Sequence, residues 1–200
     1  MLWLIPKLNH KGDVSASHIG YMISPLNVIN IFSEGKQFGV DNDCYSGKFN
    51  KDKFLKLMDK IMPYKNKCLF VNPPDVVGNY EKTTESYCQW YREIKDRGLP
   101  ISYILQDGFR MKLPELKPDC LFVGGSTEFK LSQIVLRYLQ VVGSGYWVHI
   151  GRVNSFKRIM HFRFVMDSFD GTDVAMYPNV ILKQRNRELA WLRSQLELNI

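Results

Sequence analysis

Most of the short apolar runs in this chain are followed by a residue that can take part in chemistry. Those residues are Asp41, Asp75, Gln106, Gly124, Gly125, His149, Asp167 and Asp170. Two carboxyl groups facing one substrate suit glycosidic chemistry, in which one attacks C1′ of a sugar and the other carries the proton of a base. An amide and a pair of glycines suit the edge of a planar heterocycle, since glycine lets a base approach the main chain. The residue types therefore predict a site where a sugar is transferred to or from a base.

Each of these residues has a simpler explanation when it is taken alone. An aspartate before a glycine, such as Asp107, usually belongs to a turn, and Gly124–Gly125 suits a tight turn. A single histidine such as His149 is more often a structural residue whose hydrogen bonds are satisfied. Six strand ends that all carry polar groups or bare backbone are hard to explain by packing, so we favour an active site.

Other catalytic chemistries find less support in the sequence. No serine lies in a nucleophile elbow, and no cysteine pairs with a histidine in a plausible nucleophile motif. Metal ligation by aspartate and histidine has no supporting spacing, and we expect neither a metal ion nor an organic cofactor. The cysteines are Cys44, Cys68, Cys88 and Cys120, with no Cys-x-x-Cys pair, which disfavours a zinc knuckle.

The same cysteines bear on where the protein works. Cys68 and Cys120 lie in apolar runs and are typical of reduced core thiols, which favours a cytoplasmic location. The apolar start of the chain is too short for a signal peptide. No run of 18 apolar residues occurs, so we expect no membrane-spanning helix and no membrane partner.

The elements that must position the polar residues are short strands alternating with amphipathic helices. Strands are predicted at Leu2–Ile5, Phe38–Val40, Cys68–Val71, Ile101–Leu105, Cys120–Val123, Tyr146–Ile150 and Phe162–Met166. Apolar stripes at helical spacing fall within 54–62, 87–94, 131–142 and 182–196. Continuous apolar runs are typical of parallel strands that are buried on both faces. Residues 6–36 show little pattern and are predicted to hold an irregular excursion.

This alternation predicts one domain over residues 1–200 with a parallel sheet, either open or closed. No Gly-x-Gly-x-x-Gly follows the first strand, which disfavours a dinucleotide-binding doubly wound sheet. A (β/α)8-type TIM barrel of the α/β class fits better. The chain is short for that class, so some helices should be short or missing. In such a barrel the carboxyl ends of the strands meet at one face, which would bring the polar residues together.

A basic balance favours a polyanionic partner. The net charge is +7 and the isoelectric point about 9.2, and lysine and arginine neutralise phosphates. Arg152, Lys157 and Arg158 form a basic cluster beside the expected rim. The cluster has two interpretations, a phosphate clamp and the solvated start of a helix.

At these residues the chain resembles the tRNA-guanine transglycosylase superfamily, and most of all its short phage-type members related to the DNA 7-deazaguanine transglycosylases. The resemblance runs from about residue 38 to 171. Members are (β/α) barrels, pentosyltransferases that replace guanine by a 7-deazaguanine through a covalent glycosyl-enzyme intermediate.

The resemblance assigns roles in the order of the chain. The segment Asp41–Tyr45 is similar to the family's Asp-Ser-Gly-Gly-Tyr/Phe, which makes Asp41 the general acid/base and Tyr45 the aromatic that stacks on the base. Asp167–Asp170 resembles Asp-x-Phe-Asp, which makes Asp170 the nucleophile, with Asp167 as the alternative. The residues implied to bind the base are Asp75, Gln106, Gly124, Gly125 and His149.

The chain also departs from the family. The zinc motif Cys-x-Cys-x-x-Cys with a distant histidine is absent, which favours DNA over tRNA as the partner and leaves the oligomeric state open. Asp43 and Cys44 replace two glycines near the base, so the pocket should differ in shape. A phage-encoded member would act in the host cytoplasm.

Two other functions remain open from the sequence. A glycosidase would let water complete the reaction and release the base. A barrel without turnover would only bind nucleic acid or a modified base. We favour base exchange, with DNA and a free 7-deazaguanine as substrates.

Overall fold

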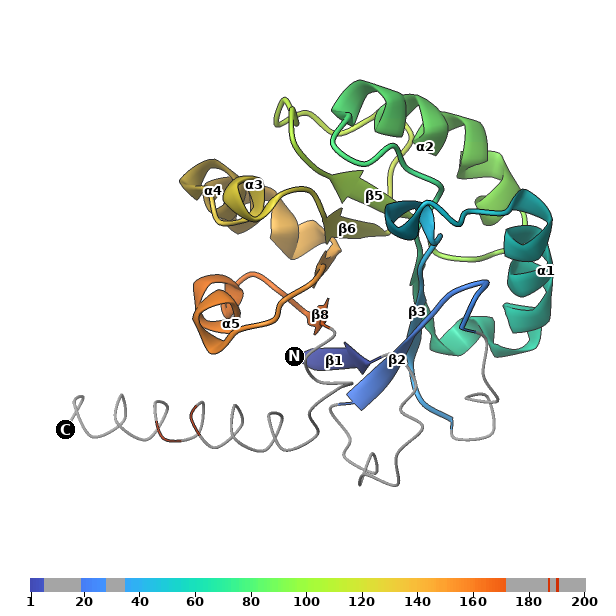
Figure 1. The fold of residues 1–200 in the computed structure, drawn as a ribbon, viewed down its shortest axis with the longest axis horizontal. Helices are drawn as coiled ribbons and strands as arrows, with labels where there is room; N and C mark the ends of the chain where they lie inside the picture. Colours follow the sequence, from blue (N-terminus) through green and yellow to red (C-terminus); the bar gives the residue numbers. More distant parts are fainter. Residues whose placement is uncertain (6–18, 28–34, 172–186, 188–189, 191–200) are drawn as a thin grey trace.

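The fold is a ring of eight parallel strands, seen in a computed structural model that describes residues 1–5, 19–27, 35–171, 187 and 190 (Figure 1). The strands are β1 (Leu2–Ile5), β2 (Ile19–Ile23), β3 (Phe38–Val40), β4 (Cys68–Val71), β5 (Ser102–Leu105), β6 (Cys120–Val123), β7 (Trp147–Ile150) and β8 (Ser168–Asp170). Their order is β4-β3-β2-β1-β8-β7-β6-β5. The end strands β4 and β5 meet through one bridge between Val71 and Ile101, so the barrel is nearly closed. This confirms the predicted irregular TIM-like barrel.

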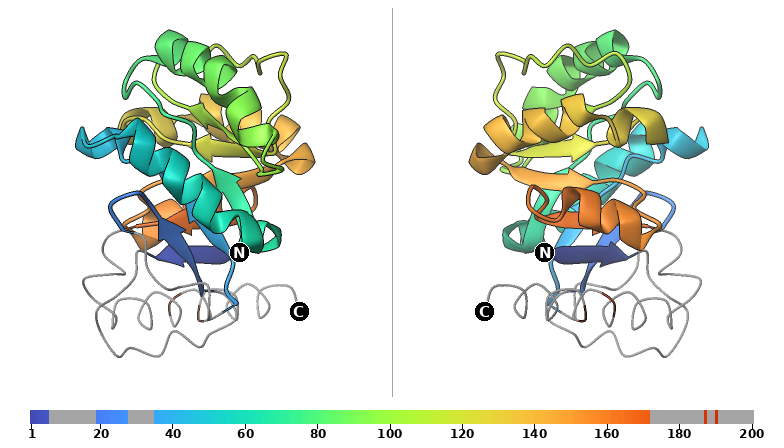
Figure 2. Two further views of the ribbon diagram at one scale, coloured as in Figure 1. Left: turned by 90° about the vertical axis from the view of Figure 1, so that its right-hand side faces the viewer. Right: turned by 90° about the vertical axis from the view of Figure 1, so that its left-hand side faces the viewer.

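Within residues 35–171 five helices lie outside the strands. They are α1 (Lys51–Ile61), α2 (Tyr80–Lys95), α3 (Thr127–Lys130), α4 (Gln133–Val142) and α5 (Phe156–Phe162), with 3-10 turns η2 (Cys44–Ser46), η3 (Met62–Lys67) and η4 (Gly143–Gly145). Two opposite views show α1 against one side of the strands and α5 against the other (Figure 2). The connection 106–119 between β5 and β6 contains no helix.

The helices begin where the sequence supplies a capping side chain. Asn50, Asn79, Ser126, Ser132 and Ser155 each accept a hydrogen bond from a backbone N–H in the first turn of the following helix. The predicted stripes within 54–62, 87–94 and 131–142 pack most of their apolar side chains against the core, whereas Ile134 in the third stripe is 59% exposed. The stripe at 182–196 lies outside the described residues, apart from single positions within it.

Two strand predictions were wrong. Phe162–Met166 is not a strand: α5 ends at Phe162, a turn follows, and Phe164 is 80% exposed. Phe162 and Met166 are both buried and lie four residues apart, which is a helical spacing. A short apolar run does not by itself distinguish a helix from a strand. The last strand among the described residues is instead β8, three residues long.

The second error concerns β2, which lies inside the stretch predicted to be irregular. Ile19, Tyr21 and Ile23 alternate and are buried. Gly20 between them cannot carry a side chain, because a Cβ there would lie 2.6 Å from the carbonyl oxygen of Gln37. Glycine weakens the strand signal in a sequence, although here it lets β2 pack closely against its neighbours.

The barrel interior is filled by side chains rather than hollow. Phe70, Phe122 and His149 form a ring cluster, with centroids 4.8 to 5.9 Å apart. Leu2, Leu4 and Cys120 are buried around the same cluster. Because these side chains fill the interior, a ligand can bind only at the carboxyl ends of the strands.

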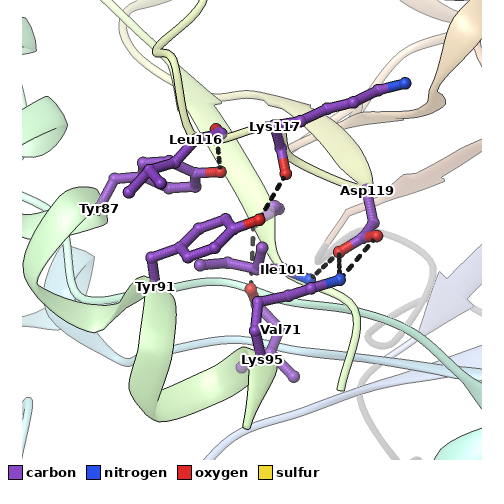
Figure 3. A network of polar contacts seen from close by, with 9 residues as sticks. Val71, Tyr87, Tyr91, Lys95, Ile101, Leu116, Lys117 and Asp119 are labelled. Carbon is purple, nitrogen blue, oxygen red and sulfur yellow. Dashed lines mark hydrogen bonds and ion pairs between the residues drawn. The ribbon is translucent and has the colours of Figure 1, made fainter. Parts of the chain in front are cut away.

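A network of hydrogen bonds ties α2 to the segment before β6 (Figure 3). The Tyr87 hydroxyl donates to the carbonyl of Leu116 at 2.8 Å, and the Tyr91 hydroxyl donates to that of Lys117 at 3.2 Å. Asp119 accepts from Lys95 Nζ at 2.9 Å and from the backbone N–H of Ile101 at 2.8 Å. The network holds β5 in place beside the incomplete pairing with β4, although no helix connects β5 to β6.

The close packing in the interior makes Gly39 a test of the fold. A Cβ at Gly39 would lie 2.5 Å from Phe70 Cζ, within the ring cluster. We expect Gly39→Ala to lower the free energy of unfolding by about 1–3 kcal/mol, because an extra methyl in a filled core forces neighbours to shift. Urea unfolding measures this. Gly145→Ala, with open space around its Cβ, is the control and should change the free energy by less than about 0.5 kcal/mol.

Candidate functional site

A cavity of about 270 Å³ lies at the carboxyl ends of the strands. Eight of the residues predicted from the sequence line it: Asp41, Tyr45, Asp75, Gln106, Gly124, Gly125, Arg152 and Asp170. They follow or end β3, β4, β5, β6, β7 and β8, so residues far apart in the chain meet at one face of the barrel. Four of the predicted residues do not line the cavity, namely His149, Lys157, Arg158 and Asp167.

Asp170 is the last residue of β8 and is held at one of its two oxygens. Its Oδ1 lies within hydrogen-bond distance of His149 Nε2, at 3.0 Å, and accepts a hydrogen bond from the backbone N–H of Arg152 at 3.0 Å. Its Oδ2 has no hydrogen-bond partner within the part of the chain that the structure describes. The side chain is 21% exposed, which leaves one oxygen available to a molecule in the cavity.

Asp41 is a buried carboxyl group in the same cavity. Burial raises the pKa of Asp41 from its usual 3.8 to about 6, against a lowering by the Asn42 backbone N–H. The charge of Asp170 raises the pKa further, and a hydrogen bond from Asn72 lowers it. Two carboxyl groups thus interact across one cavity, and one of them can hold a proton near neutral pH.

Asn72 and Asn42 support the acids, and the sequence analysis gave neither of them a role. Ser102 Oγ donates to Asn72 Oδ1 at 2.6 Å, which turns the amide nitrogen of Asn72 toward Asp41. Asn42 Nδ2 donates to Asp75 Oδ1 at 3.0 Å. Their position one residue after β4 and two residues after β3 was the available signal, since side chains there lie at the same end of the barrel as the carboxylates.

Asp75 is a third carboxyl group in the lining, hydrogen-bonded to the residue that follows Asp41. Burial raises the pKa of Asp75, while the hydrogen bond from Asn42 lowers it. The charge of Arg152 also lowers it, so the acid and the base of the rim act on each other across the cavity. A carboxyl group there presents an acceptor to the N–H groups of a bound heterocycle.

Gln106 lines the cavity, but its amide is used inside the protein. Nε2 donates to the carbonyl of Val76 at 3.1 Å and to Thr83 Oγ1, and Oε1 accepts from the backbone N–H of Gly78 at 2.8 Å. Every hydrogen-bonding group of the amide therefore has a protein partner. Gln106 holds the loop 76–78 at the rim instead of reading the edge of a base, which corrects the role predicted for it.

The Gly124–Gly125 turn brings backbone to the cavity wall. Gly125 has a positive φ of 73°, and a Cβ there would lie 2.6 Å from Asp107 Oδ2. Asp107 accepts from the backbone N–H of Ser126 at 2.7 Å and from its hydroxyl at 2.6 Å. Asp107 is therefore a turn residue, and the turn it stabilises requires glycine at 125.

Arg152 covers one side of the cavity together with Tyr45. The guanidinium carbon lies 4.0 Å from the centre of the Tyr45 ring, and Nη2 donates to the carbonyl of Gly125 at 2.8 Å. Arg152 has a positive φ of 56°, which is uncommon for a residue with a side chain and points its N–H at Asp170. Tyr45 is 66% exposed, so one face of this pair borders solvent.

The other basic residues lie behind Arg152. Arg158 donates to the carbonyl of Arg152 at 3.1 Å and to Thr127 Oγ1 at 3.1 Å, while Lys157 is exposed. Lys130, which the sequence analysis missed, is buried and donates to the carbonyl of Gly151 at 2.9 Å. Burial lowers the pKa of Lys130 to about 8. Arg158 and Lys130 thus hold the 151–152 turn, and of the predicted phosphate clamp only Arg152 lines the cavity.

Asp167, the alternative nucleophile, lies at the wrong end of the barrel. It precedes β8, and its Oδ2 accepts from the backbone N–H of Val148 at 2.8 Å near the start of β7. It lines a separate hollow beside Gly143 and Tyr146. A strand at 162–166 would have placed Asp167 at the carboxyl end of the barrel. The wrong position predicted for Asp167 therefore follows from the wrong strand prediction.

His149, predicted to bind the base, does not line the cavity either. Its side chain is fully buried inside the barrel, beneath Asp170, which it contacts through Nε2. Burial lowers the pKa of His149, against the raising effect of Asp170. His149 therefore contacts the carboxyl group of Asp170 on the side away from the cavity and does not face the cavity itself.

Neither a metal centre nor a membrane span is found among the described residues. Within residues 1–5, 19–27 and 35–171, no three His, Cys, Asp or Glu side chains are placed to hold a metal ion. None of the helices in these ranges has the length and hydropathy needed to cross a membrane.

Comparison with known proteins gives a likeness of fold alone. No family model and no curated protein matches the chain. Among solved structures, the Bacillus subtilis YkuI protein, with an EAL domain and in complex with substrate c-di-GMP and calcium, has a TM-score of 0.40 at 12% identity. The match covers 91% of this chain and 45% of that one, so this chain spans less than half of that protein. So distant a likeness assigns neither a family nor a ligand.

The raised pKa of Asp41 predicts a change in stability with pH. The folded protein binds the Asp41 proton more tightly than the unfolded chain, so folding loses free energy as pH rises from 3.8 to about 6. We expect Asp41→Asn, which mimics the protonated acid, to be more stable than the original protein above pH 6, by about 3 kcal/mol at most. The gain should vanish near pH 3.8.

Urea unfolding at about pH 3, 4, 5, 6 and 8, a range that brackets both pKa values, measures the effect. Asp59→Asn, at an exposed carboxyl group on α1, is the control and should show no such gain with rising pH. If the free energy of unfolding of Asp41→Asn, measured relative to the original protein, decreases from the lowest to the highest pH, Asp41 is not a buried acid that destabilises the fold.

Proposed function

We propose that the protein exchanges a nucleobase in a nucleic acid, replacing guanine by a 7-deazaguanine through a glycosyl-aspartate intermediate. The observation that carries the proposal is the pair of unlike acids in one cavity. Asp170 has one oxygen fixed by two N–H donors and the other open to the cavity, while Asp41 has a pKa raised to about 6. A nucleophile and a proton carrier are the two groups that this reaction needs.

In the first step Asp170 Oδ2 attacks C1′ of the target nucleotide. The C1′–N9 bond breaks as the C1′–O bond forms, and guanine leaves with the proton that Asp41 donates. The product is a sugar joined to Asp170, an ionised Asp41 and free guanine. The backbone N–H of Arg152 and the His149 N–H stay on Oδ1, so the attacking oxygen is defined by exclusion.

In the second step a 7-deazaguanine occupies the place of guanine. Its N9–H proton passes to the carboxylate of Asp41, N9 attacks C1′, and Asp170 is released. Two inversions give net retention at C1′. Asp41 ends protonated and Asp170 ionised, so both acids return to their starting state.

The rest of the lining suits a planar, nitrogen-rich ligand. Asp75 offers carboxylate oxygens to N–H groups of the base, and Tyr45 offers an aromatic face at the rim. Gly124 and Gly125 let the base approach the main chain. The target nucleotide must be flipped from its stack or met in a single strand to reach this depth.

The nucleic-acid partner is favoured by charge. The chain carries +7, and Arg152 lies on the rim beside the cavity. DNA is favoured over tRNA because the zinc segment of the tRNA enzymes is absent from the sequence. The identity of the incoming base comes from the resemblance of the motifs around Asp41 and Asp170 to the transglycosylases.

The proposal predicts a covalent adduct between the protein and DNA. Incubation with a guanine-containing single-stranded oligonucleotide should give a product that survives denaturation and carries one sugar-linked strand per protein. Asp170→Asn should abolish it, because the carboxamide is a poor nucleophile. Mass spectrometry of the denatured mixture, with peptide mapping of the linked residue, measures the result.

Asp167→Asn is the matched control, since Asp167 is an aspartate that directly precedes β8, whereas Asp170 ends it. This variant should form the adduct at the rate of the original protein. Base release without incorporation of a 7-deazaguanine would identify a glycosidase. Binding without any adduct, unchanged by Asp170→Asn, would identify a binding protein, and either outcome overturns the exchange reaction.

Adduct formation should also depend on pH in a defined direction. Asp41 must be protonated to give its proton to the departing guanine, so the single-turnover rate should fall as pH rises through about 6. Asp41→Asn should be slower by roughly 10²–10⁴-fold, the usual worth of a positioned acid, and should lack this descending limb. A rate that rises through the same pH range in the original protein would assign the proton to another group.

A further inference from the structure

Four side chains of β7 and β8 form a continuous chain of hydrogen bonds inside the barrel. Trp147 Nε1 donates to Ser168 Oγ at 2.8 Å, and Ser168 Oγ lies 2.8 Å from His149 Nδ1. His149 Nε2 lies 3.0 Å from Asp170 Oδ1. Ser168 and His149 are both fully buried, so water does not compete for these bonds.

The direction of the bonds is set by what each group can do. An indole N–H can only donate, so Ser168 Oγ is an acceptor toward Trp147 and its own proton is left for His149 Nδ1. Nδ1 then accepts, and the single proton of a neutral imidazole lies on Nε2. At the far end, the carboxylate of Asp170 can only accept, which also requires a proton on Nε2.

Packing holds the imidazole in this orientation. The Phe122 ring stacks on it with centroids 4.9 Å apart and an interplanar angle of 23°, and the Phe70 ring packs at 4.8 Å. Within the described part of the chain, Asp170 is the charged group that contacts the ring, and it does so through Nε2. A ring flip would break both hydrogen bonds at once inside a filled core.

We propose that Trp147 and Ser168 are positioning residues that fix His149 as the neutral Nε2–H tautomer, a permanent hydrogen-bond donor that orients Asp170. His149 then never accepts a proton during a reaction at the cavity. It keeps Oδ1 engaged together with the Arg152 N–H, so that Oδ2 faces the cavity. The catalytic meaning of this orientation rests on the proposed function, whereas the tautomer itself does not.

The tautomer is measured by NMR on the full-length protein with ¹⁵N-labelled histidine. At neutral pH His149 should show a protonated Nε2 and an unprotonated Nδ1, with the resonances assigned by their loss in His149→Gln. An Nδ1–H tautomer, or a doubly protonated ring, overturns the proposal. This result does not depend on whether the protein exchanges bases.

Two variants separate the effect of the Trp147–Ser168 hydrogen bonds, called the relay below, from the effect of Asp170 alone. Asp170→Asn should keep the Nε2–H tautomer, because Ser168 still donates to Nδ1. Adding Trp147→Phe to Asp170→Asn frees the Ser168 hydroxyl to accept, and the tautomers should become mixed. Trp90→Phe, on α2 and away from the relay, is the matched control in the same background and should change nothing. Unmixed tautomers in the double variant would show that the relay does not set the proton.

The orientation of Asp170 is then tested by kinetics of adduct formation. Ser168→Ala and Trp147→Phe should lower the maximal rate, by roughly 10- to 100-fold for Ser168→Ala, as expected for a misplaced reacting group. The oligonucleotide concentration at half-maximal rate should stay unchanged, since neither residue lines the cavity. An unchanged rate in both folded variants overturns the positioning role. Absence of any adduct in the original protein counts against the proposed function and leaves the NMR result standing.

Discussion

The parallel pairing of β1 with β8 is the contact on which the site depends. Leu2 pairs with Ser168 and Leu4 with Asp170, which joins the last described strand to the first. Without that pairing the end of β8 would not reach the ends of β3 and β4, and Asp170 would be separated from Asp41 and Asp75. Because β8 has only three residues, its position is set by the neighbours β1 and β7 more than by its own length.

The second constraint is that the cavity holds charged and strained groups that work against folding. Asp41 is buried with its pKa raised, and Arg152 adopts a left-handed backbone conformation with its guanidinium against Tyr45. Lys130 is buried beneath the same turn. Such features persist where the surrounding structure over-determines them, here through the filled barrel below and the capped helices outside. Their concentration at one end of the barrel distinguishes that end from the interior filled by Phe70, Phe122 and Leu4.

The polar residues around the cavity divide into those that face it and those that hold its frame. Gln106, Asp107 and Arg158 have their polar atoms bound to loops of the rim. Asp41, Asp75 and Asp170 turn carboxyl groups to the space itself. A sequence does not separate these two groups, because both kinds of residue come after strands. Only the partners of each atom show which side chains remain for a ligand.

The amino-acid sequence by itself determined the class of fold and the place of most lining residues. Continuous apolar runs such as Cys68–Val71 and Cys120–Val123 are typical of strands buried on both faces, and the polar residues after each run then lie at one end of a parallel barrel. Only the tertiary structure showed that β2 and β8 are strands and that Asp167 lies at the amino end of β8. These strands are too short or too rich in glycine to be recognised locally, and they form because neighbouring strands offer unpaired hydrogen-bonding groups. The tertiary structure also gave His149 its role, since its hydrogen-bonded chain to Trp147, Ser168 and Asp170 depends on the register in which β7 pairs with β8.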